Sequence, residues 1–102
     1  MAMVDISHPE GGTAVDERIA KLITLIWEKV GIGTTRQEVL ENGNVFICFR
    51  HMHFVTSFME ITQLDSSSLR SERVCVGSAR RIYSLEFSLE KVPDMVKRLE
   101  DV

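Results

Sequence analysis

The sequence has few of the residues that mark specialised classes of chain. Only 2 prolines and 2 cysteines are present, which excludes a proline-rich repeat and a disulfide framework. The longest apolar patch, residues 22–27, is interrupted by Thr24 and is far shorter than the roughly 20 residues that a membrane helix needs. The N-terminal residues show no basic segment before an apolar stretch, so no signal peptide is predicted. These absences favour a cytoplasmic protein whose thiols, Cys48 and Cys75, are reduced.

An excess of charge of one sign is also lacking. Lys and Arg number 12 and Asp and Glu number 15, which gives a formal net charge of −3. Such a mild acidic balance argues against nucleic acid or an anionic membrane as the main partner. With 102 residues, of which 44% are hydrophobic and 26% charged, the chain has the composition of one globular domain over residues 1–102.

Apolar residues at helical spacing predict three amphipathic helices. The first is capped by Thr13 or Asp16 and ends at Gly31, where glycine commonly follows a helix. Its apolar stripe consists of Val15, Ile19, Leu22, Ile23, Ile26 and Val30. The second helix covers residues 53–64, and the third begins near Pro93, which is tolerated in a first helical turn.

The segments between these helices have the patterns of β-hairpins. An Asn42–Gly43 pair separates residues 33–40 from the β-branched and aromatic segment 45–49, which predicts a hairpin. A second hairpin is expected from a short strand at 74–76 and a longer alternating strand at 81–89.

This order of elements predicts an α+β domain with two layers. We expect an antiparallel sheet of about four strands, covered on one face by two or three helices. If residues 3–6 add an edge strand to that sheet, the topology approaches a ferredoxin-like fold. Alternation directs Val45, Ile47 and Phe49 toward the core. The opposite side of the sheet, which we call the second face, then carries Arg36, Glu38, Phe46, Cys48, Arg50, Ser84 and Glu86.

The densest cluster of ligand-type side chains is Cys48, Arg50, His51 and His53. Histidine and arginine there could bind a small anion or transfer a proton in a pocket between the sheet and the second helix. Enzymatic activity stays an open question, because no residue that would orient a Cys48 nucleophile and no oxyanion device is recognisable, and a small buried thiol is the favoured interpretation. The spacing completes no known ligand set, so neither a metal nor a cofactor is predicted.

Four arginines form the largest local charge imbalance. Residues 70–81 contain a single acidic residue, Glu72, and four arginines, Arg70, Arg73, Arg80 and Arg81. Such a cluster could meet a phosphate or a carboxylate, although a solvated surface is the interpretation we favour.

Residues 42–49 resemble the central strand motif of RNA recognition modules. Phe46 stands at the second stacking position of that motif, whereas Asn42 and Asn44 replace its basic residue and its first aromatic. The resemblance implies weak binding of single-stranded RNA through the sheet, as one alternative function.

The function that we expect first is a non-enzymatic interaction module that forms a homodimer. An open antiparallel sheet can leave a polar face in water or pair it with a second copy. The expected interface residues are Trp27, Arg36 and Phe46, since aromatic residues and arginine are enriched at interfaces.

Overall fold

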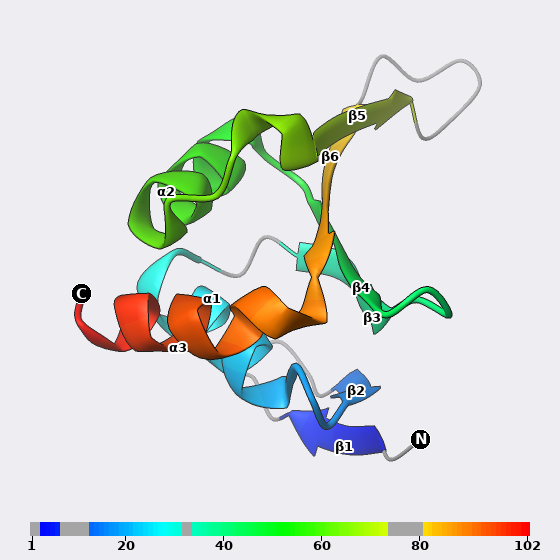
Figure 1. The fold of residues 1–102 in the computed structure, drawn as a ribbon. Coiled ribbons are helices and arrows are strands. Elements are labelled where there is room, and N and C mark those ends of the chain that lie inside the picture. The colour runs from blue at the N-terminus through cyan, green and yellow to red at the C-terminus, as the bar shows by residue number, and fades with distance from the viewer. Residues whose placement is uncertain (1–2, 7–12, 32–33, 74–80) are drawn as a thin grey trace.

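The computed structural model describes residues 3–6, 13–31, 34–73 and 81–102 (Figure 1). In this part of the chain the elements follow in the order β1 (Met3–Ile6), β2 (Thr13–Asp16), α1 (Ala20–Lys29), β3 (Thr34–Val39), β4 (Asn44–Phe49), α2 (Met52–Thr62), β5 (Leu69–Arg73), β6 (Arg81–Ser88) and α3 (Val92–Glu100). Short 3-10 turns precede β5 and α3. The predicted α+β class with antiparallel strand pairing is confirmed.

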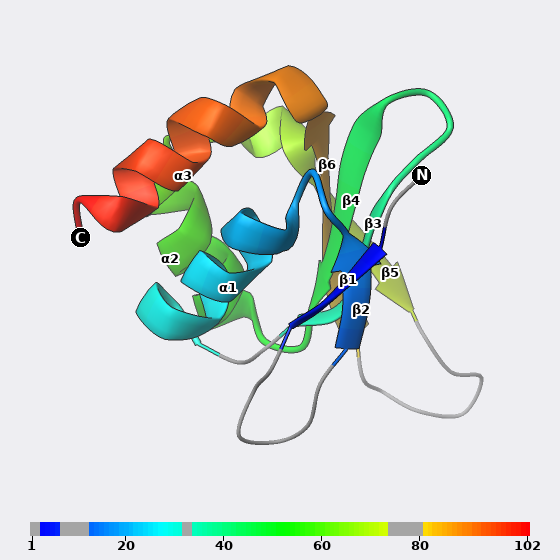
Figure 2. The ribbon, with the colours of Figure 1, turned by 90° about the horizontal axis from the view of Figure 1, so that it is seen from below.

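The strands form two sheets. The larger has the order β3-β4-β6-β5, and the smaller pairs β1 with β2. In Figure 1 the three helices lie to one side of β4 and β6, and Figure 2 shows β1 and β2 side by side next to α1. Residues 3–6 therefore pair with 13–16 and do not extend the larger sheet, so the ferredoxin-like alternative is wrong.

The start of the first helix was also predicted wrongly. Residues 13–16 form β2, and α1 begins only at Ala20, after an N-cap residue, Ile19, that makes no side-chain cap. The carboxylate of Asp16 is instead engaged by Arg18, whose backbone N–H donates to Asp16 Oδ1 at 2.9 Å. An apolar residue at Val15 fits the helical stripe, but here it points into the core from a strand.

The β3–β4 hairpin agrees with the prediction. Gly43 has a φ of +85°, which favours glycine, and the Asn44 backbone N–H donates to Asn42 Oδ1 at 2.9 Å. The expected strand at 74–76 lies outside the described residues. Besides β4, the strand β5 pairs with β6. It was not predicted, because Leu69–Arg73 is polar and lacks an alternating pattern.

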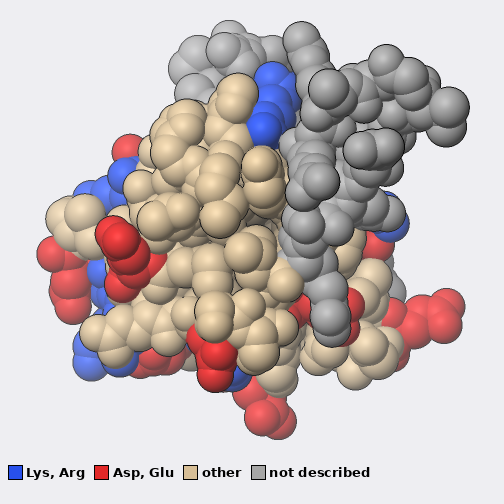
Figure 3. All heavy atoms as spheres, turned by 90° about the horizontal axis from the view of Figure 1, so that it is seen from above, with Lys and Arg blue, Asp and Glu red and all other residues tan. Residues whose placement is uncertain are grey.

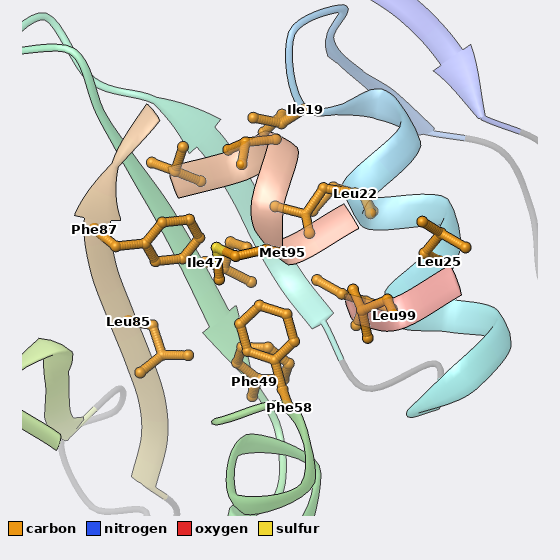
Figure 4. Packing of buried hydrophobic residues seen from close by; sticks show 14 of the residues in the cluster. Ile19, Leu22, Leu25, Ile47, Phe49, Phe58, Leu85, Phe87, Met95 and Leu99 are labelled. Carbon is orange, nitrogen blue, oxygen red and sulfur yellow. The ribbon is translucent and has the colours of Figure 1, made fainter. Parts of the chain in front are cut away.

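The core lies between the larger sheet and the helices (Figure 4). Ile47 and Phe49 of β4 and Leu85 of β6 are fully buried, as alternation along these strands requires. The ring of Phe58 from α2 packs 5.6 Å from that of Phe49, centroid to centroid. Met95 and Leu99 of α3 and Leu22 of α1 close the core from the helical side. This packing occupies one side of the sheet. On the second face Phe46 is partly exposed, whereas Cys48 and Ser84 are buried.

Candidate functional site

The second face is organised around Phe46. Glu38 and Glu86 are the Cα partners of Phe46 on β3 and β6, so the partly exposed ring lies between two carboxylate-bearing residues. The guanidinium of Arg36 lies over the ring, with 5.2 Å from Cζ to the centroid. Arg36 Nη2 also donates to Glu38 Oε1 at 2.7 Å. An aromatic side chain is thus surrounded by charges of both signs.

Hydrogen bonds order the acidic residues of this face. Asn44 Nδ2 donates to Glu86 Oε2 at 2.8 Å, which ties β4 to β6 beside Phe46. Glu38 is held by Arg36 from its own strand. Two carboxylates and one guanidinium therefore have defined positions around the ring.

Cys48 and Ser84 occupy the row next to Phe46. They are Cα partners, and their exposed fractions are 5% and 2%. A thiol this deeply buried is a poor candidate for a nucleophile that must meet a substrate. The structure therefore supports the interpretation of Cys48 as a small packed side chain.

Trp27 lies on the other side of the sheet. It belongs to α1, packs against the core, and donates from Nε1 to Thr34 Oγ1 at 2.6 Å. This hydrogen bond fastens α1 to the start of β3. Because Phe46 points away from the helices, Trp27 and Phe46 do not belong to one surface, although both are expected interface residues.

The structure brings His51 and His53 together at the start of α2. Their ring centroids are 5.4 Å apart, and both side chains are exposed. Arg50, which follows β4, is exposed as well. Cys48 is the exception in the predicted cluster, since it is buried within the sheet while the other three reach solvent.

The remaining candidate ligand groups are metal-binding clusters and the four arginines of residues 70–81. Among residues 3–6, 13–31, 34–73 and 81–102, no three or more His, Cys, Asp or Glu side chains are grouped so that they could hold a metal ion. Arg73 and Arg81 are Cα partners in the β5–β6 pair, and Arg70 pairs with Ser84. Arg80 lies outside the described residues.

A half-buried ion pair between Asp16 and Arg18 was not predicted from the sequence. Asp16 is 3% exposed and accepts two side-chain hydrogen bonds from Arg18, from Nε at 2.9 Å and from Nη2 at 2.7 Å. The side-chain hydrogen bonding from Arg18 lowers the pKa of Asp16, and burial only partly opposes it. The pair lies between β2 and α1, where it fixes a turn, and its role is structural.

The surface over α2 is poor in charge. Glu60 is the only Asp, Glu, Lys or Arg among the 11 residues of this helix, and residues of other types fill the middle of the view in Figure 3. Met52 is 44% exposed there. No helix in the described part of the chain is long and apolar enough to cross a membrane.

Comparisons with protein-family models, with curated proteins and with solved structures gave no match.

Proposed function

We propose that this domain is an interaction module that forms a homodimer through the second face of its larger sheet. The observation that carries the proposal is the Phe46 ring, partly exposed on that face, beneath the guanidinium of Arg36. Aromatic residues and arginine are the types that contribute most to protein interfaces. No catalytic arrangement is needed for this function.

The charges around Phe46 favour a second copy as the partner. Glu38 and Glu86 flank the ring, and Arg36 covers it, so one face presents both signs of charge. In a two-fold dimer each residue meets the same patch on the partner, which requires a self-complementary surface. A face with positive and negative groups around one aromatic residue meets that requirement. We infer that Arg36 of one protomer contacts Glu86 of the other.

Pre-ordering of these groups lowers the cost of association. Arg36 is already held by Phe46 and Glu38, and Glu86 by Asn44. Ordering a flexible side chain at an interface costs about 0.5–1.5 kcal/mol, so side chains that are ordered beforehand lose less on binding.

The test is the molar mass in solution of the parent protein and of two matched variants. Phe46→Ser removes the aromatic residue of the second face. Met52→Ser removes an exposed apolar side chain of α2, on the helical side of the sheet, and serves as the control. We expect a dimer for the parent and for Met52→Ser and a monomer for Phe46→Ser, with light scattering as the readout. A monomeric parent protein at concentrations of up to hundreds of micromolar would contradict the proposal.

A further inference from the structure

His51 and His53 form a pair of exposed imidazoles that the proposed dimer does not use. Their ring centroids are 5.4 Å apart, and the ring planes differ by 20°. The two residues are separated by one position, but His51 has extended backbone angles (φ −132°, ψ 140°) whereas His53 lies in the first turn of α2. This change of backbone conformation brings together two side chains that a regular helix would separate.

Phe54 holds the pair in place. Its ring centroid lies 5.6 Å from that of His51 and 4.2 Å from that of His53. Phe54 is itself fixed against the end of α1, because a Cβ on Gly31 would lie only 2.5 Å from Phe54 Cε1. The two imidazoles therefore pack beside a ring that the fold positions, which keeps them close to each other.

We propose that His51 and His53 chelate one divalent transition-metal ion, with Zn²⁺ as the representative ion. Imidazole nitrogens bind Zn²⁺ at about 2.0–2.1 Å, so two imidazoles that share one ion have centroids roughly 5–6 Å apart. The observed 5.4 Å falls in this range. The ring planes must turn for one nitrogen of each to face the ion, which the solvent exposure of both side chains permits.

The surroundings indicate which ions the pair selects. The first turn of α2 contains no acidic residue, so both ligands are nitrogen atoms and the oxygen donors that Mg²⁺ and Ca²⁺ require are missing from it. Water, or the same pair from a second copy, supplies the remaining positions. The amino end of a helix carries partial positive charge, which opposes a bound cation. We therefore expect micromolar affinity, below that of a four-ligand structural site.

The experiment is a calorimetric titration of the full chain with ZnCl₂ in a buffer that does not bind metal. The variants are His51→Ala, His53→Ala and, as the matched control, His8→Ala, which removes the third histidine of the chain. We expect saturable binding of one ion per chain, or of one ion per two chains. Loss of either paired imidazole should weaken the binding by at least about tenfold, whereas His8→Ala and the parent should agree.

Three outcomes would overturn the proposal. They are the absence of saturable binding at millimolar ZnCl₂, unchanged binding in both paired variants, and equal binding of MgCl₂ by the parent. Circular dichroism of each variant checks that the fold is intact. The titration is independent of the dimer, because Phe46→Ser leaves both histidines in place and should bind Zn²⁺ as the parent does.

Discussion

Arg36 on β3 and Phe46 on the neighbouring strand β4 form a cation–π contact in which the guanidinium Cζ lies 5.2 Å from the ring centroid. Such a contact contributes about 0.5–1 kcal/mol at an exposed site, which is too little to explain by itself why a large aromatic side chain stands on the polar face of a sheet. The interface that we propose would account for the ring and for the charges ordered around it.

Replacement of Asp16 by asparagine should destabilise the protein at neutral pH. Asp16 is buried and ion-paired with Arg18, whose side chain is 43% exposed, so solvent screening limits the expected loss to about 1 kcal/mol. Asp94→Asn is the control, because the Asp94 side chain is 65% exposed and its carboxylate accepts a hydrogen bond from Arg98 Nε at 2.8 Å. That variant should change the free energy of unfolding by less than about 0.5 kcal/mol.

The contribution of Asp16 should depend on pH in a defined direction. Its pKa is lowered in the folded protein, so its stabilisation is present above the ordinary carboxyl pKa of about 3.9 and disappears as the pH falls through the folded value. Urea unfolding of the parent and of Asp16→Asn should therefore differ at pH 7 and converge in strong acid. A difference that is constant over this range would show that Asp16 stabilises through packing alone.

Replacement of Gly31 by alanine should be more damaging than replacement of Gly43. Both glycines have positive φ, +146° and +85°, so either alanine is strained by about 1–3 kcal/mol. At Gly31 the new methyl group also meets Phe54, whereas at Gly43 nothing lies within 4 Å. Urea midpoints of the two variants measure the difference. If both variants lose the same amount of stability, Phe54 moves aside freely. Phe54 would then not hold His51 and His53 in place.

Replacement of Gln37 by methionine should leave stability unchanged or slightly raised. Gln37 Oε1 is buried and accepts no hydrogen bond in the described part of the chain, and a buried acceptor without a partner costs about 1–3 kcal/mol. Its cross-strand neighbour Ile47 gives the contrast, since Ile47→Ala should cost about 2–5 kcal/mol. Thermal unfolding of both variants suffices, and a marked loss in Gln37→Met would show that the amide is bonded in solution.

The elements predicted best are those whose side-chain pattern has one explanation. Along β4, the alternating direction of side chains in a strand identified Val45 and Ile47 as core residues and Phe46 as a residue of the second face, and an Asn-Gly turn identified the hairpin. The start of α1 was predicted wrongly because Val15 fits a helical stripe and a short strand equally well. Residues 13–16 form a strand because they pair with β1, a contact that the local sequence pattern does not reveal.

The candidate site was predictable only in part. Sequence placed Arg36 and Phe46 on one face, because strand register follows from alternation. It could not show whether His51 and His53 converge, since they lie where a strand conformation changes to a helix. Nor could it show that Trp27 faces Thr34 on the opposite side of the sheet, which depends on how α1 packs.

The most direct test of the dimer exchanges the charges that we pair across it. Arg36→Glu and Glu86→Arg each place like charges at both copies of the contact, so each variant alone should be monomeric. Mixed together, they restore both opposite-charge contacts in one heterodimer. Native mass spectrometry of the two variants, separately and mixed, gives the answer. The account predicts two monomers that combine into a one-to-one dimer on mixing, and it is contradicted if the mixture stays monomeric or if either variant dimerises by itself.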